Sequence, residues 1–301
     1  MELVIMGSIS LSSIVEAVVA FPWIRMGVIF GFFYLVLCVW GLLFADKLLF
    51  PAPSNPTYEK DENIGFLTTP SGLQIAYKIW KPSAESKGTI LYSHGNGEDL
   101  GMIENAISPL IEEGYACVSY DYPGYGHSSG KPSEQGCYEA IDAVFTKLIR
   151  DDEIFKNQIV LWGRSLGTGP SCYLAAREKV AGLLLETPFI TAFRTATEIP
   201  IVPWDHFPSI NRAPHIKTES LVIHGCEDEI VPFRHGKKLF ERLPEPKSFL
   251  EITDGNHNDL PEIGGKKYRL AINNFLKKVL KNSESSSATP RLQYNLFNHG
   301  H

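Results

Sequence analysis

A serine flanked by glycines most constrains what this chain can fold into. Residues 163–167 read Gly-Arg-Ser-Leu-Gly, a G-x-S-x-G pattern, and they follow an apolar run at 159–162. A segment with helical character lies just beyond, at 172–176. Strand, tight turn and helix in this order are the context of a nucleophile elbow, where small neighbours tolerate a strained serine backbone. The same pattern also arises by chance in loops, so residues elsewhere must decide between the two interpretations.

Strand and helix candidates alternate from residue 89 onward, which predicts a mostly parallel sheet flanked by helices on both faces. Before them, two alternating stretches at 65–68 and 73–80 flank a Pro-Ser-Gly turn and predict a β-hairpin. The expected parallel strands are residues 89–92, 116–120, 159–162, 180–185, 221–223 and 249–252, and the expected helices are 100–111, 133–149, 235–243 and 266–280.

A serine nucleophile needs a general base, and the base needs an acid that orients it. Asp228 directly follows an expected strand, with Glu227 and Glu229 as close competitors. His257 lies in the loop after the last expected strand. Serine, acid and histidine follow one another in the chain order that accompanies a nucleophile elbow. The sequence therefore predicts a catalytic triad of Ser165, Asp228 and His257.

The expected reaction also needs donors for a developing oxyanion. The backbone amide of Leu166, the residue after the nucleophile, is one candidate. The loop at 93–99 supplies the other, because its glycines allow the amide of Asn96, or of Gly97, to turn toward the serine. We therefore expect an oxyanion hole formed by Asn96 and Leu166.

The glycines of this loop also fit, loosely, the phosphate loop of a dinucleotide-dependent reductase. Such an enzyme needs a Tyr-x-x-x-Lys pair well downstream, whereas Tyr77 and Lys81, the one such pair, lie upstream. No C-x-x-C spacing suggests a zinc site, so we expect neither a metal nor an organic cofactor. A net charge of −6 gives no reason to expect nucleic-acid binding.

Five separate motifs together resemble one branch of the α/β-hydrolase superfamily. That branch contains membrane-associated hydrolases, some of which remove palmitoyl groups from proteins. The resemblance covers roughly residues 60–280. The matching motifs are residues 94–99 (HGNGED), 121–133 (DYPGYGHSSGKPS), 163–167 (GRSLG), 224–228 (HGCED) and 255–259 (GNHND).

The resemblance implies an α/β-hydrolase fold and a serine hydrolase, with Ser165 as nucleophile, Asp228 as acid, His257 as base and a loop amide near Asn96 in the oxyanion hole. The chain departs from the branch in two respects. Many members carry alanine at the position of Gly97. The cysteine-rich, lipid-modified N-terminus of the depalmitoylating members is absent, and an apolar segment stands in its place.

Residues 26–45 form an unbroken apolar run of the length that spans a bilayer. A signal peptide fits less well, because the run exceeds the usual apolar region and no small-x-small site closes it. A buried core helix rarely lacks polar residues for so long. Residues 3–23 are also mainly apolar, but Glu16 and Pro22 interrupt them, so they form either an interfacial segment or a second span.

We therefore expect a single-pass membrane anchor at 1–50, with that second span left open, and a stiff linker at 51–62. An α/β-hydrolase catalytic domain at 63–281 follows, with a short aromatic lid near 187–214 and a disordered tail at 282–301. The charges beside the anchor are too balanced to set its orientation. The scattered, odd-numbered cysteines and the lack of an N-x-S/T acceptor favour a cytoplasmic catalytic domain.

Together these features predict a membrane-anchored serine hydrolase that cleaves acyl ester or thioester bonds through an acyl-enzyme. Its expected partners are the membrane and an acylated substrate, either a lipid or a lipidated protein. A prolyl-peptidase-like serine peptidase shares the triad but commonly carries a large extra domain. A catalytically silent membrane scaffold with this fold would not need every catalytic residue.

Overall fold

The structure is a computed structural model that describes residues 10–20, 22–53, 55–197 and 200–286. The chain separates into two compact units, Met1–Leu49 and Phe50–His301.

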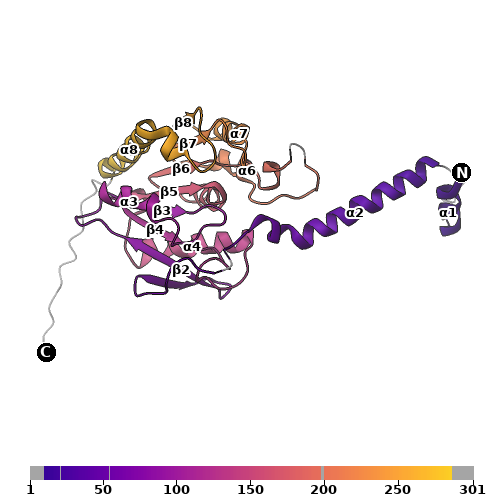
Figure 1. The fold of residues 1–301 in the computed structure, drawn as a ribbon, viewed down its shortest axis with the longest axis horizontal. Coiled ribbons are helices and arrows are strands. Elements are labelled where there is room, and N and C mark those ends of the chain that lie inside the picture. The colour runs from indigo at the N-terminus through magenta and orange to yellow at the C-terminus, as the bar shows by residue number, and fades with distance from the viewer. Residues whose placement is uncertain (1–9, 21, 54, 198–199, 287–301) are drawn as a thin grey trace, which may run out of the picture. The chain divides into compact units, whose positions relative to one another are not determined.

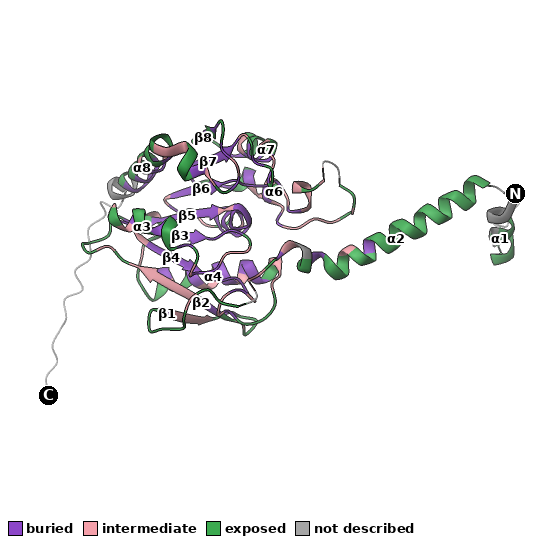
Figure 2. Cartoon of the chain, in the orientation of Figure 1, coloured by how far each residue is buried: buried purple, intermediate pink, exposed green. Residues whose placement is uncertain are grey.

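The N-terminal unit contains two helices, α1 (Leu11–Ala20) and α2 (Pro22–Leu49). Within α2, the stretch Pro22–Lys47 is long and apolar enough to cross a membrane. Only 11% of its most apolar window is buried, and Figure 2 shows α2 exposed along most of its length. The expected run at 26–45 lies inside α2. The second apolar segment begins within residues 1–9, which lie outside the described residues.

The second unit is built on an eight-stranded sheet in the order β1-β2-β4-β3-β5-β6-β7-β8, which Figure 1 shows from bottom to top. β2 pairs antiparallel with β1 and β4, and every later pairing is parallel. This is the expected α/β-hydrolase fold. The strands are β1 (Ile64–Thr68), β2 (Gln74–Trp80), β3 (Thr89–Ser93), β4 (Ala116–Tyr120), β5 (Ile159–Arg164), β6 (Gly182–Glu186), β7 (Ser220–Gly225) and β8 (Lys247–Ile252).

Helices cover both faces of this sheet. The helices of the unit are α3 (Glu104–Glu112), α4 (Glu134–Arg150), α5 (Thr168–Ala175), α6 (Ser209–Arg212), α7 (Arg234–Arg242) and α8 (Leu260–Ser286). On one face, Ile90 and Tyr92 of β3 share a core cluster with Ile107 of α3 and Leu276 of α8. Successive strand residues point to opposite faces, so Leu91 lies on the other side, where α4 packs beside α5. All five residues of β3 are buried, which accounts for the apolar run at its centre.

The start of α4 lies close to the expected position, whereas α3 and α8 have ends that differ from it. Ser133 caps α4, because its hydroxyl accepts a hydrogen bond from the backbone amide of Gly136 at 3.1 Å. α3 begins at Glu104 rather than at residue 100, since the Asp99 carboxylate binds the amide of Gly101 and holds a turn there. α8 continues to Ser286, past the predicted start of the tail; residues 287–301 lie outside the described residues.

The segment expected to be a linker is partly packed on the hydrolase unit. The Thr57 amide donates to Asp99 at 2.7 Å, and the Thr57 hydroxyl also donates to this carboxylate. The Tyr58 hydroxyl donates to the buried Asp121 carboxylate. These partners lie far along the chain, so the proline-rich composition at 51–56 gave no indication of them.

The stretch expected to be a lid, 187–214, combines buried and exposed apolar side chains. Phe189 and Phe207 are buried, and their ring centroids lie 6.2 Å apart. Ile201 is 46% exposed. Residues 198–199 lie outside the described residues, and the role of this stretch as a lid stays a prediction.

Candidate active site

Ser165 occupies a strained turn at the carboxyl end of β5. Its φ is +49°, in the left-handed region that side-chain-bearing residues disfavour. A short 3₁₀ turn, η2 (Ser165–Gly167), follows at once, and α5 begins at Thr168. Strand, strained serine and helix therefore occur in the expected order. A backbone of this kind costs about 1–3 kcal/mol and persists where the surrounding structure enforces it.

Close backbone approaches enforce this turn. A Cβ atom on Gly163 would lie 2.4 Å from the carbonyl oxygen of Gly167, and one on Gly167 would lie 1.9 Å from that of Ser93. Neither position therefore tolerates a side chain. The second contact also presses the elbow against the end of β3, where the predicted oxyanion loop begins.

The structure brings the three predicted triad residues together. The Oγ atom of Ser165 lies 2.9 Å from Nε2 of His257, and Nδ1 of His257 lies 2.8 Å from Oδ2 of Asp228. All three residues are buried, whereas Glu227 and Glu229 are exposed. β5, β7 and β8 are parallel, so the loops at their carboxyl ends meet at one edge of the sheet. This geometry allows the imidazole to accept the Ser165 proton while Asp228 holds the ring.

Asp228 is held on both of its oxygens. Oδ1 accepts the backbone amides of Ile230 and Val231, at 2.9 and 2.7 Å. On the Oδ2 side, Nε2 of His224 lies 3.3 Å away, in addition to His257. Burial alone would raise the pKa of Asp228, but hydrogen bonds from the two histidines outweigh it and hold the pKa well below its usual range. The group is therefore a carboxylate at neutral pH.

The predicted oxyanion residues lie on adjoining segments. Leu166 is buried in η2, directly before the glycine that touches the end of β3. Asn96 lies in the loop after β3, and its Oδ1 atom accepts the Tyr125 hydroxyl at 2.7 Å. Gly97 has a φ of +77°, so the loop turns sharply beside Asn96. The donor roles of the Asn96 and Leu166 amides stay predictions.

His94 anchors the start of the same loop from inside the protein. It is fully buried, its Nδ1 lies 2.9 Å from the carbonyl oxygen of Gly95, and its Nε2 lies 3.5 Å from Oδ1 of Asp121. Burial alone would lower the pKa of His94, but the Asp121 carboxylate outweighs it and raises the pKa. Tyr122 adds a hydrogen bond from its hydroxyl to the His94 carbonyl at 2.7 Å. Buried polar contacts therefore hold this loop.

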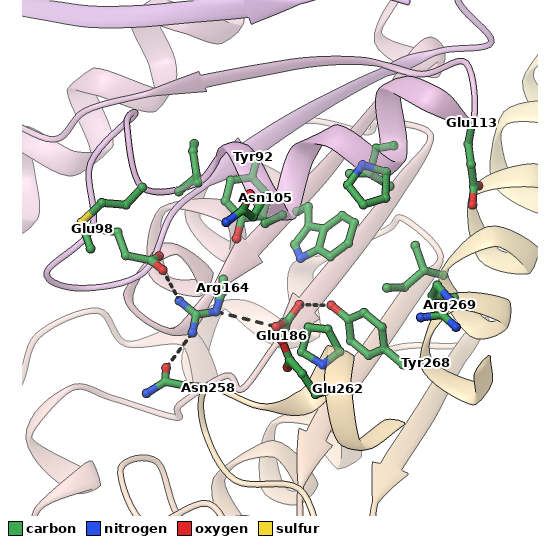
Figure 3. A pocket seen from close by; sticks show the side chains of 18 of the residues that line it. Tyr92, Glu98, Asn105, Glu113, Arg164, Glu186, Asn258, Glu262, Tyr268 and Arg269 are labelled. Carbon is green, nitrogen blue, oxygen red and sulfur yellow. Dashed lines mark hydrogen bonds and ion pairs between the residues drawn. The ribbon is translucent and has the colours of Figure 1, made fainter. Parts of the chain in front are cut away.

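Sequence reasoning missed Arg164, the residue before the nucleophile. Figure 3 shows its guanidinium between Glu98, Asn258 and Glu186, which come from three different parts of the chain. A charged residue at the end of an otherwise apolar strand was the available indication. Among the described residues, no group of three or more His, Cys, Asp or Glu side chains could hold a metal ion.

Comparisons with known proteins place the chain. A family model for the alpha/beta hydrolase fold matches residues 88–200. Alpha/beta hydrolase domain-containing protein 17B of Xenopus tropicalis is 37% identical over 228 residues, which are 74% of this chain and 78% of that protein. The chain belongs to this alpha/beta hydrolase family.

Another family member, alpha/beta hydrolase domain-containing protein aho-3 of Caenorhabditis elegans, is 40% identical over 190 residues. The match covers 62% of this chain and 57% of that relative's length. Human protein 17B is 36% identical, and the match covers 78% of it. The family supports a hydrolase activity for this chain.

Solved structures show the same fold at low sequence identity. An esterase of Pyrococcus furiosus matches with a TM-score of 0.64 at 17% identity, over 76% of this chain and 99% of that one. A monoacylglycerol lipase of Paleococcus ferrophilus matches with a TM-score of 0.53 at 20% identity, over 68% of this chain and 98% of that one. These likenesses concern the fold alone.

Proposed function

We propose that this family member is a membrane-anchored serine hydrolase that cleaves acyl esters or thioesters. One observation carries the proposal: an unbroken hydrogen-bonded line from the Ser165 hydroxyl through His257 to the Asp228 carboxylate. A serine, a base and an orienting acid within hydrogen-bond reach are the requirements for an activated nucleophile. The strained backbone of Ser165 adds support, because nucleophile elbows have this conformation.

In the proposed mechanism, Ser165 attacks the acyl carbonyl carbon while Nε2 of His257 takes the hydroxyl proton. The tetrahedral intermediate collapses, the bond to the leaving oxygen or sulfur breaks, and His257 protonates that atom. A water molecule, deprotonated by the same imidazole, then attacks the acyl carbon; the bond to Ser165 Oγ breaks, and His257 returns the proton to that oxygen as the acid leaves. Asp228 holds the imidazole in place and stabilises its positive form in both halves of the reaction.

The amides of Leu166 and Asn96 would stabilise the negative oxygen of each tetrahedral intermediate. The contact between Gly167 and the end of β3 supports this assignment, because it brings the two donor segments side by side. Losing one oxyanion donor typically lowers the rate by about 10²–10³-fold.

An amphiphilic or acylated substrate, either a lipid or a lipidated protein, suits a hydrolase tethered to a bilayer. The apolar helix α2 supports the tether, and the aromatic stretch at 187–214 supports an apolar acyl site. The four cysteines of the hydrolase unit are free thiols, three of them buried, which supports a domain on the cytoplasmic, reducing side.

Labelling with a fluorophosphonate probe tests the nucleophile. We expect the unmutated protein to be labelled, Ser165→Ala to lose the label, and Ser108→Ala, a change at an exposed serine on α3, to keep it. An unlabelled wild-type protein would instead favour a catalytically silent scaffold. Label that survives Ser165→Ala would mean that another residue is the nucleophile.

The substrate class is tested separately with a series of p-nitrophenyl esters from acetyl to palmitoyl. We expect kcat/KM to rise with chain length up to at least octanoyl, because each buried methylene contributes about 0.8 kcal/mol. A strong preference for acetyl would contradict an apolar acyl site. Faster cleavage of a prolyl amide than of any ester would favour the peptidase alternative.

A further inference from the structure

The Arg164 guanidinium contacts side chains from two other loops, the loop after β3 and the loop after β8. Its Nη1 atom lies 2.6 Å from Oε1 of Glu98, in the loop after β3, and its Nη2 atom donates to Oδ1 of Asn258 at 2.7 Å. Asn258 directly follows His257, and Arg164 directly precedes Ser165. Figure 3 shows both contacts converging on one side chain. The elbow, the loop after β3 and the histidine loop therefore share one cation.

The contact with Glu98 extends into the backbone of the oxyanion loop. The second oxygen of this carboxylate, Oε2, accepts the amide of Gly95 at 2.6 Å. A Cβ atom on Gly95 would lie 2.7 Å from that oxygen and 2.8 Å from Nη1 of Arg164, so a larger residue there would have to displace these two side chains. Arg164 thereby fixes the backbone next to Asn96, the proposed oxyanion donor.

A second carboxylate, that of Glu186, contacts the guanidinium from the sheet side. Glu186 ends β6, is buried, and has its Oε1 atom 3.7 Å from Nε of Arg164. Its other oxygen accepts the Tyr268 hydroxyl at 2.8 Å. The Arg164 side chain is only 15% exposed. A planar fork of donors meets these separate acceptors at once, which the single ammonium of a lysine does less well.

The space behind this bridge is open rather than packed. A cavity of about 330 Å³ is lined by Arg164, Glu98 and Asn258 together with side chains of α3 and α8. Elsewhere in a protein interior, close packing would keep such loops in place. Here the charge-assisted hydrogen bonds of Arg164 add to the buried contacts of His94 in holding the loops.

We propose that Arg164 is a positioning residue for the hydrolase reaction: it holds the His257 loop and the Asn96 loop at fixed distances from Ser165. The inference rests on the proposed function. Arg164 touches neither the reacting hydroxyl nor the imidazole, so it acts through Glu98 and Asn258. Its removal should disturb the geometry of the reacting groups more than the binding of substrate.

The test compares Arg164→Lys and Asn258→Ala in the full chain, with Arg177→Lys as the matched control. Arg177 forms a more exposed ion pair with Asp142 at 2.9 Å, so its substitution leaves the three loops untouched. Asn258 is exposed, which makes its substitution safe for folding. The readouts are kcat and KM for an ester, the rate of fluorophosphonate labelling, and the melting temperature.

We expect kcat and the labelling rate to fall about 10²-fold in Arg164→Lys, since a misplacement near 1 Å costs that much. In Asn258→Ala they should fall about tenfold, the value of one hydrogen bond to a charged group. KM should change little in both variants, and Arg177→Lys should match the unmutated protein. The double variant should be no slower than Arg164→Lys alone, because both changes remove the same contact.

Unchanged kcat in both Arg164→Lys and Asn258→Ala would overturn the inference, and so would a lower melting temperature without a lower kcat. If the unmutated protein takes no label at all, the proposed function itself fails. If it is labelled and the variants are labelled equally fast, only the positioning role fails.

Discussion

The Asp228 carboxylate meets Nδ1 of His257 with Oδ2, at 2.8 Å, while its Oδ1 atom accepts two backbone amides. The two oxygens therefore have different partners, and the carboxylate cannot rotate without losing hydrogen bonds. The orientation of the imidazole follows from this arrangement.

Asp228→Asn should lower kcat about 10⁴-fold, as in other triads of this type. The backbone amides of Ile230 and Val231 would claim the one amide oxygen, so the NH₂ group would face Nδ1 of His257. The imidazole would then carry its proton on Nε2, which could no longer accept one from Ser165. Steady-state ester hydrolysis measures the loss.

Glu227→Gln and Glu229→Gln are the controls, because both side chains are exposed neighbours of Asp228. Each should retain activity within about twofold, as expected for surface positions. A loss in either control as large as that of Asp228→Asn would identify a different acid.

Gly167→Ala should destabilise the protein by about 1–3 kcal/mol or prevent folding, since its methyl group would overlap the carbonyl of Ser93. Chemical unfolding gives the free-energy change. Gly31→Ala, in α2, has nothing within 4 Å of the added atom and should have no such effect. Equal stability of the two variants would contradict the close approach of elbow and loop.

Tyr58→Phe should lower the free energy of unfolding by about 1–3 kcal/mol, because it removes a hydrogen bond from the buried Asp121 carboxylate. Tyr173→Phe is the matched comparison, since its hydroxyl donates at 3.0 Å to Asp142, which is about one-third exposed and can turn to water. The first change should cost more. An equal or smaller cost would mean that residues 57–58 are not fixed to the domain.

His235 should make the domain less stable as the pH falls from 7 to 5. Burial, together with the positive charge of Arg234, lowers the pKa of His235 to about 4. The unfolded chain, with an ordinary value near 6.5, therefore binds a proton first, and stability is lost below that pH. Urea unfolding at pH 7 and pH 5 should show roughly 1–2 kcal/mol less loss in His235→Asn than in the unmutated protein. The raised pKa of His94 makes the domain more stable as the pH falls, so the effect of His235 is isolated only by comparing the pH-dependent loss in the variant and in the unmutated protein. An equal loss in both proteins would refute the assignment to His235.

A chain that starts at Phe50, the boundary of the two units, should leave the membrane fraction and keep its activity on a water-soluble ester. The full chain should resist carbonate extraction and retain its N-terminus by mass spectrometry. If the mature protein instead lacks the N-terminal segment through α2, that segment is a signal sequence.

Much of this fold could be predicted because short stretches of sequence determine its strands and its serine turn. Buried parallel strands such as β3 and β5 read as short apolar runs, and the glycines of the elbow are spaced by the turn itself. The chain order of Ser165, Asp228 and His257 then suggested residues that the structure brings together. Their catalytic roles stay predictions.

The remaining features depend on partners far along the chain. Arg164 pairs with Glu98 and Asn258, which lie 66 and 94 positions away in the sequence. Thr57 binds the carboxylate of Asp99, which lies 42 positions away. No periodicity or composition reports such contacts, because only the folded sheet brings the loops to one edge. The packing of residues 57–58 and the partners of Arg164 were therefore apparent only in the structure.

The pairing of Arg164 with Glu98 and Asn258 also limits how the serine motif can be exchanged. A chimaera that carried residues 163–167 into a relative with other residues at those two places would bring a partly buried cation without two of its acceptors. Conversely, replacing residues 163–167 of this chain by a motif with a neutral residue before the serine would leave Glu98 without its cationic partner. The elbow thus depends on residues from three loops, and an engineer would have to transplant that set whole.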